Sequence, residues 1–184
     1  MEVISTPLSG ALILRSKRFN DPRGFFSESY NKRCLRELGI EVEFVQDNLS
    51  FSTARRTLRG LHFQSEPLAQ DKLVSILRGV ALDVIVDLRQ SSLTYGKHFS
   101  LKLSEADSAQ LFVPVGFAHG FLTLEPNTLL AYKVSKYYSP EHDRGIRWDD
   151  ARLAIDWGLM GDAPTLSARD GQLPAFDPRE RYFA

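Results

Sequence analysis

The sequence has a single cysteine, no long apolar run and no excess of either charge. Cys34, the only cysteine among 184 residues, has no partner for an internal disulfide. Its setting, KRCLREL, favours a small buried side chain over a reactive thiol. The run ALIL at 11–14 is too short for a signal peptide or a membrane-spanning helix, and no later run is long enough. We therefore expect a soluble, cytoplasmic protein with no membrane contact.

The charges balance, with 23 Lys and Arg against 23 Asp and Glu and no long block of one sign. This balance argues against nucleic acid or an anionic membrane surface as the main partner, so any anionic ligand must be met by local cations. The chain also lacks a Pro/Gly/Ser-rich linker, an internal repeat and a low-complexity segment. Its length suits one hydrophobic core, and we expect residues 1–184 to form a single domain.

Alternation of apolar and polar residues dominates positions 42–138. VALDVIVDLR at 80–89 and KHFSLKLS at 97–104 both alternate with period 2, and turn signals such as YG at 95–96 and EPN at 125–127 separate such segments. Short strands without helices between them predict an all-β sandwich or barrel. One helix is expected over 31–39, where Asn31 caps its start and Gly39 ends it. The tail from 150 is irregular, with a short helical turn near TLSARD at 165–170.

Several polar residues interrupt the apolar faces of these strands. His62 lies in RGLHFQ at 59–64, Lys72 shares its side with Val74 and Ile76, and Tyr132 shares its side with Leu130. Each has an ordinary explanation: a histidine with one hydrogen bond, a lysine reaching solvent at a strand end, a tyrosine packed in a core. Each is also suited to a ligand cavity inside a barrel.

Gly60 bears on how the arginine and the histidine of RGLHFQ are arranged. In a regular strand Arg59 and His62 point to opposite sides. A bulge at Gly60 would bring both side chains to one site.

A metal centre needs two to four convergent ligands, often His-x-His with a carboxylate. Here Phe63 and Gln64 follow His62, and PVGFAHGF adds only His119. The ligand set is incomplete, and we expect no metal.

Long motifs in a fixed order then add a family resemblance. RGLHFQ, QDKLVSILRGVALDVIVDLR, FVPVGFAHGF and YKVSKYYSPEHDRGIRWDD, together with DPRGFFSESY and LSARD, resemble the dTDP-4-dehydrorhamnose 3,5-epimerase family, the RmlC-like branch of the cupins. The resemblance covers nearly the whole chain. It implies a jelly-roll β-barrel with one or two short flanking helices, a homodimer, and no metal or organic cofactor. The implied reaction inverts C3 and C5 of a nucleotide-linked 4-keto-6-deoxyhexose, from dTDP-4-dehydro-6-deoxyglucose to dTDP-4-dehydro-L-rhamnose.

The resemblance also implies catalytic roles, which agree with the chemistry of the residue types. His62 matches the base, Tyr132 the opposing acid, and Lys72 the cation beside the C4 oxygen. Carbons C3 and C5 both flank the C4 carbonyl, so one oxyanion site serves both inversions. Asp170 matches the carboxylate that orients the histidine and stabilises its charged form.

Substrate contacts are implied at positions from the whole chain. The family pattern places them at Phe19, Arg23, Phe26, Glu28, Gln46, Asp47, Asn48, Arg59, His119, Tyr138, Asp143 and Arg169. Among these, Phe19 and Tyr138 are the expected stacking partners of the nucleobase, and arginines suit a diphosphate. Asp143 stands where glutamate is usual and Arg169 where lysine is usual, which alters the reach of both charges and bears on sugar or nucleotide preference.

Three alternatives remain at this point. A single-site epimerase or ketoisomerase on a related nucleotide sugar shares the fold, although the acid at Tyr132 favours double inversion. A sugar-binding cupin without catalysis has no need of a base, an acid and a cation together. A metal-dependent cupin dioxygenase requires ligands that the sequence lacks.

Overall fold

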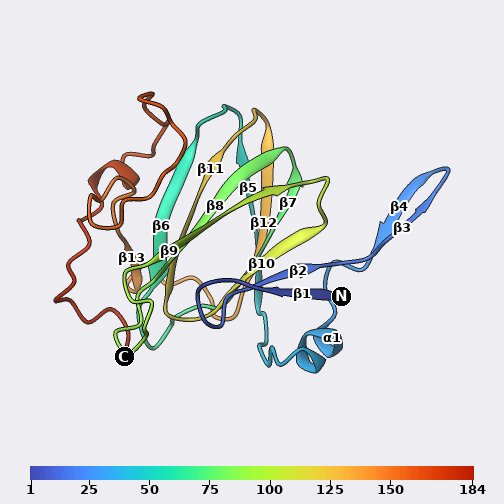
Figure 1. Cartoon of the computed structure of the whole chain (residues 1–184), viewed down its shortest axis with the longest axis horizontal. Coiled ribbons are helices and arrows are strands. Elements are labelled where there is room, and N and C mark those ends of the chain that lie inside the picture. Colours follow the sequence, from blue (N-terminus) through green and yellow to red (C-terminus); the bar gives the residue numbers. More distant parts are fainter.

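The computed structural model describes all 184 residues, and its regular secondary structure is almost entirely antiparallel β-strand (Figure 1). One sheet has six strands in the order β1-β2-β10-β7-β12-β5, and a second has five in the order β13-β6-β11-β8-β9. The six-stranded sheet contains β1 (Glu2–Ser5), β2 (Leu12–Arg15), β5 (Gln46–Ser52), β7 (Lys72–Arg78), β10 (Ala109–Val113) and β12 (Thr128–Val134). The five-stranded sheet contains β6 (Leu58–Gln64), β8 (Val80–Asp87), β9 (His98–Ser104), β11 (Phe117–Thr123) and β13 (Asp143–Gly145). The two sheets form a jelly roll, which confirms the predicted fold class.

The main core lies between the two sheets. Apolar side chains from alternate positions of both sheets meet there and are fully or almost fully buried, among them Val74, Ile85, Leu111, Phe121 and Leu130. Tyr132 packs against this core from β12. Because successive side chains on a strand point to opposite faces, Lys72 shares the inward face with Val74 and Ile76, as the sequence predicts.

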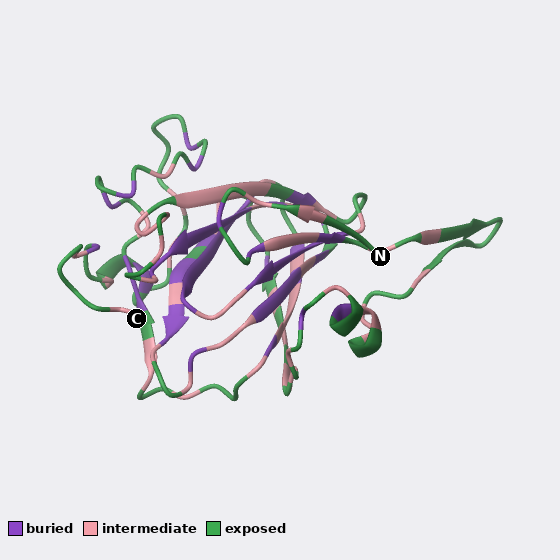
Figure 2. Cartoon of the chain, turned by 60° about the horizontal axis from the view of Figure 1, so that its bottom comes forward, coloured by how far each residue is buried: buried purple, intermediate pink, exposed green.

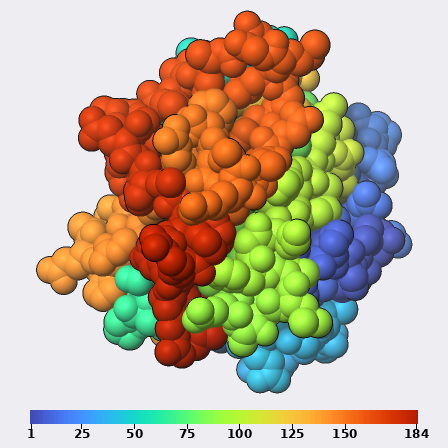
Figure 3. Space-filling model, turned by 60° about the vertical axis from the view of Figure 1, so that its left-hand side comes forward, coloured from blue at the N-terminus to red at the C-terminus, as the bar shows by residue number.

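The outer face of the five-stranded sheet is covered by the C-terminal segment, residues 146–184. Side chains of this segment, including Trp157 and Phe176, join Val84 and Val86 of β8 in a second core. Figure 3 shows the segment, coloured orange to red, spread over one side of the molecule. Both faces of β8 are therefore buried, and the face that carries Asp83 looks into the barrel.

A short helix covers the outer face of the six-stranded sheet. Helix α1 (Lys32–Glu37) begins after Asn31, whose side chain accepts hydrogen bonds from the amides of Arg33 and Cys34. It ends before Gly39, whose φ of +82° suits glycine. Leu35 is buried against the sheet. The predicted helix is confirmed, although it is shorter than 31–39, and the predicted turn is the 3₁₀ helix η1 (Asp170–Gln172).

A hairpin projects away from the barrel. Its strands, β3 (Arg18–Asp21) and β4 (Gly24–Ser27), pair only with each other. Figures 1 and 2 show the hairpin extending into solvent, and its phenylalanines are exposed, with 54% of Phe19 and 70% of Phe26 accessible. Exposed apolar side chains grouped on one projection are typical of an interaction surface. The structure has no helix long and apolar enough to span a membrane.

Candidate active site

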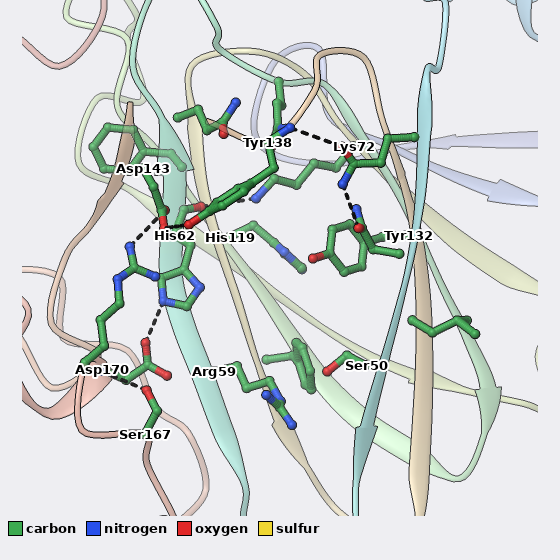
Figure 4. Close-up of a pocket in the computed structure, with 18 residues that line it drawn as sticks. Ser50, Arg59, His62, Lys72, His119, Tyr132, Tyr138, Asp143, Ser167 and Asp170 are labelled. Carbon is green, nitrogen blue, oxygen red and sulfur yellow. Dashed lines mark hydrogen bonds and ion pairs between the residues drawn. The ribbon is translucent and has the colours of Figure 1, made fainter. Parts of the chain in front are cut away.

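A pocket of about 540 Å³ opens between the two sheets. Its walls come from β6 and β11 on one side, from β5, β7 and β12 on the other, and from the turn around η1. Figure 4 shows that its polar side chains converge on one space. The lining residues are Gln46, Asn48, Leu49, Ser50, Arg59, His62, Phe63, Gln64, Gln70, Lys72, His119, Phe121, Tyr132, Tyr138, Asp143, Ser167, Arg169 and Asp170.

A bulge in β6 brings Arg59 and His62 to the same pocket. His62 pairs with His119 of β11 and Arg59 pairs with Phe121, so three steps along β6 match two along β11. Gly60 occupies the bulge, where an added Cβ would lie 2.6 Å from the Cα of Gly120. The predicted bulge is confirmed, and glycine is required because the two strands approach too closely for a side chain.

The imidazole of His62 is paired with the carboxylate of Asp170. His62 Nε2 lies 2.5 Å from Asp170 Oδ1, although the two residues are 108 positions apart. With Nε2 bonded to the carboxylate, Nδ1 is left for the pocket. Burial alone would raise the pKa of the Asp170 carboxyl. The hydrogen bond and charge of His62, the bond to Ser167 and the charge of Arg169 together hold this pKa below its usual value. Asp170 is therefore a buried anion that can stabilise a charged imidazole.

Lys72 supplies a buried cation beside the histidine. The residue is 7% exposed, and its Nζ donates to the backbone carbonyl of His62 at 3.3 Å. Burial lowers the pKa of Lys72 to about 8, against the opposing charges of Asp143 and Asp83. The ammonium thus faces the polar cavity, one of the two alternatives left open by the sequence.

Tyr132 stands across the pocket from His62 (Figure 4). It belongs to β12 in the six-stranded sheet, whereas His62 belongs to β6 in the five-stranded sheet. Burial raises the pKa of the Tyr132 hydroxyl; the charge of Arg59 opposes this shift and that of Asp143 adds to it. The phenol therefore keeps its proton at neutral pH and is able to donate it.

A second histidine–aspartate pair was not predicted from the sequence. His119 Nε2 lies 3.0 Å from both carboxylate oxygens of Asp83, which is fully buried and has no other hydrogen-bond partner. The only sequence signal was the aspartate in the middle of the apolar strand VALDVIVDLR. Which face of that strand looks inward depends on the C-terminal cover, and alternation alone does not give it.

The rim of the pocket carries most of the remaining predicted contacts. Tyr138 and Arg169 both reach the carboxylate of Asp143: the Tyr138 hydroxyl donates to Oδ2 at 3.1 Å and Arg169 Nη2 lies 2.8 Å from Oδ1. The two positions that depart from the family pattern are thus in contact with each other. Gln46 accepts from the Tyr138 amide at 3.1 Å and donates to Asn48 at 2.8 Å.

Five predicted substrate contacts lie outside the pocket. Asp47 points to the opposite face of β5, where Lys133 Nζ lies 2.8 Å from its carboxylate. The other four are on the projecting hairpin or just after it: Phe19, Arg23, Phe26 and Glu28. Within one chain, none of these five side chains lines the pocket.

Metal-ligating side chains do not gather anywhere in the structure. No group of three or more His, Cys, Asp or Glu is placed to hold an ion. His62 and His119 each face a single carboxylate.

The fold and the pocket define a jelly-roll protein of the cupin class, with a histidine, a tyrosine and a buried lysine around one pocket between the sheets. The family described as dTDP-4-dehydrorhamnose 3,5-epimerase matches residues 5–178. The chain belongs to this family.

Individual relatives agree over nearly full length. A dTDP-4-dehydrorhamnose 3,5-epimerase of Escherichia coli K12 is 49% identical over 182 residues, covering 96% of this chain and 95% of the relative. The crystal structure of the Bacillus anthracis epimerase with TDP and PPi bound has a TM-score of 0.93 and 48% identity, covering 95% of this chain and 99% of that one. The Legionella pneumophila enzyme in complex with dTDP-4-keto-L-rhamnose has a TM-score of 0.88 and 40% identity, covering 96% and 98%.

Proposed function

We propose that the chain is a 3,5-epimerase that converts dTDP-4-dehydro-6-deoxyglucose to dTDP-4-dehydro-L-rhamnose. The family and the ligands named for the related structures support the substrate. The observation that carries the reaction type is the position of the His62–Asp170 pair and Tyr132 on opposite walls of one pocket. Inversion at carbon requires removal of a proton on one face and its return on the other, and this arrangement suits both steps.

In the proposed mechanism, His62 Nδ1 takes the proton from C5 or C3 of the bound sugar. The electrons of the C–H bond move into the ring and onto the C4 oxygen, which gives an enolate. Lys72 and His119 stabilise that oxygen, and Asp170 stabilises the imidazolium formed at His62. Tyr132 then donates its proton to the opposite face of the carbon. Solvent restores the phenol and accepts the proton held by His62.

The nucleotide part of the substrate is assigned to the rim. Arg59 and Arg169 have the fork geometry that suits a diphosphate, and Tyr138 offers a ring for stacking. Gln46, Asn48 and the carboxylate of Asp143 are available for the sugar hydroxyls.

The residues of the hairpin lead us to propose a homodimer. Phe19, Arg23 and Phe26 lie on the projecting hairpin and do not line the pocket of their own chain, but an exposed hairpin can cover the pocket of a second copy. A hollow on the outer face of the six-stranded sheet supports this assembly. It is lined by exposed Leu49 and Leu77 and contains the buried, unpartnered polar atoms Ser16 Oγ, Arg18 Nε and Gln110 Oε1.

Subunit complementation tests the composite site. His62→Ala and Arg23→Ala chains are each expected to be nearly inactive. After mixing and subunit exchange, half of the dimers are mixed and each has one intact site, so roughly a quarter of the parent activity returns. No recovery, or a monomer in light scattering, would contradict the assembly.

Hydrogen exchange tests the reaction. In D₂O we expect deuterium at both C3 and C5 of the sugar, and His62→Ala should lower the exchange rate by about 10²–10⁴-fold. Deuterium at C3 alone would identify a single-site epimerase. Exchange by His62→Ala at the parent rate would show that another group is the base.

A further inference from the structure

Two consecutive residues of the turn around η1 form polar contacts with two neighbouring strands of the five-stranded sheet. Arg169 forms its ion pair with Asp143 of β13, and Asp170 bonds His62 of β6. Strand β13 pairs directly with β6, with Asp143 opposite Gln64 and Gly145 opposite His62. The ion pair therefore joins the turn that carries the carboxylate to the strand next to the one that carries the base.

Few other polar contacts hold this turn, although Leu166 packs against the neighbouring core and Leu173 lies against Gly145 of β13. The nearest backbone bonds on either side of the turn are at Thr165, which bonds Arg56 and Leu58, and at Pro174, which accepts from Arg147. Between these points, residues 166–173 form backbone hydrogen bonds only among themselves. Their polar contacts with the rest of the chain are the Arg169–Asp143 and Asp170–His62 pairs.

The carboxylate of Asp143 is itself held in place. Its two oxygens are used by different partners, Oδ1 by Arg169 and Oδ2 by the Tyr138 hydroxyl. Its side chain is 15% exposed, against 47% for Arg169. A half-exposed ion pair contributes little to global stability, so its influence should be local.

We infer that the Asp143–Arg169 ion pair positions the Asp170 turn, and through it the His62 base, in addition to any contact that either residue makes with substrate. The inference rests on the proposed function, in which His62 removes the sugar protons. Reaction rates are sensitive to misplacement of a catalytic group on the ångström scale. Without the pair, the only polar contact left between the turn and the barrel is the His62–Asp170 bond itself.

Kinetics of Arg169→Met, Asp143→Asn and the double variant test the inference at pH 7. We expect kcat about 10-fold lower in each single variant, and the double variant no slower than the slower single one, because each removes the same contact. If Arg169 only bound substrate, its loss would raise KM and leave kcat unchanged. The matched control is Arg56→Met, which breaks the Arg56–Asp162 ion pair of the same C-terminal segment, shortly before the turn, and should keep kcat within about twofold of the parent.

Two further measurements separate positioning from substrate binding. In the free protein, the NMR signal of the His62 Nε2 proton, identified by its loss in His62→Gln, should shift or broaden in both single variants and not in Arg56→Met. The double variant Asp143→Glu with Arg169→Lys restores an ion pair of similar reach, since one side chain lengthens as the other shortens. It should recover kcat relative to Arg169→Lys alone.

Unchanged kcat with raised KM, additive losses in the double variant, or an unaltered His62 signal would each overturn the positioning role. Failure of the parent protein to exchange the sugar protons would instead refute the proposed function, and the NMR measurement would still decide the positioning role.

Discussion

His62 and His119 are directly opposite each other in the antiparallel pairing of β6 with β11. Opposed residues of paired strands point to the same side, and both imidazoles line the pocket. The Nε2 atom of each histidine is hydrogen-bonded to an aspartate carboxylate, that of Asp170 for His62 and that of Asp83 for His119. One carboxylate lies on an irregular turn and the other on a fully buried strand. The two histidines thus have the same kind of hydrogen-bond partner, but the partner of His62 lies on a turn and that of His119 lies on a strand.

Asp83 is predicted to be necessary for activity although it does not reach the substrate. The buried carboxylate holds His119 through Nε2, which keeps the imidazole oriented toward the proposed position of the enolate oxygen. Asp83→Asn should lower kcat by about 10–100-fold with little change in KM. Asp87→Asn is the control, because Asp87 is also fully buried on β8 but bonds Arg89, Ser92 and Thr94 away from the pocket. Both variants should lose stability in urea unfolding. Only Asp83→Asn should have a lower kcat. A kcat equal to that of the parent would show that Asp83 is not needed for activity.

Activity is predicted to fall as the pH rises above about 8, the value to which burial lowers the pKa of Lys72. Loss of the ammonium removes the cation beside the enolate. The effect on stability has the opposite sign. Between pH 8 and about 10.4 the Lys72 side chain is protonated in the unfolded chain and neutral in the folded chain. Its contribution to the free energy of unfolding therefore increases as the pH rises through this range.

Lys72→Arg provides the control for this pH profile, since guanidinium stays charged throughout the range. The variant should be slower at pH 7 because its donors are differently placed, but its rate should not fall between pH 8 and 9.5. A parent rate that is constant to pH 10 would show that the charge of Lys72 is not needed.

Tyr132→Phe is predicted to separate proton removal from inversion. The ring remains to fill its place, while the hydroxyl that reprotonates the far face is lost. Proton NMR in D₂O should show exchange of sugar protons with retained configuration, and inversion slowed by at least about 10²-fold. Inversion at the parent rate would mean that another group donates the proton.

We propose that the 184 residues unfold as one domain, because the C-terminal segment shares a core with the five-stranded sheet. Fluorescence of Trp148 and Trp157, both in that segment, and circular dichroism of the strands should report the same transition. Trp157→Ala should destabilise the protein by about 3–5 kcal/mol. Leu93→Ala, at a fully exposed position, should change stability by less than about 0.5 kcal/mol. Separate transitions for the two probes would show that the segment is an independent unit.

Much of the barrel could be predicted from local pattern. The alternation over 42–138 corresponds to strands β5 to β12, and the inward direction of Lys72 follows from its spacing to Val74. The first four strands and β13 were not predicted, since segments of three or four residues contain too few alternations to be distinguished from loops. The hairpin in particular shows no alternation of buried and exposed residues, because its apolar side chains are not buried within the chain.

The sequence by itself determined the strands β5 to β12, the capped helix, and the glycine that lets Arg59 and His62 share one side of β6. Period, capping and steric freedom are local properties, so they can be read from neighbouring residues. The pairing of Asp170 with His62 across 108 positions was implied only by the family resemblance, and the tertiary structure alone decided that Asp83 faces inward and that Asp143 pairs with Arg169. Those contacts depend on strand order, on register and on the path of a C-terminal segment without periodicity, none of which has a local signal in the chain.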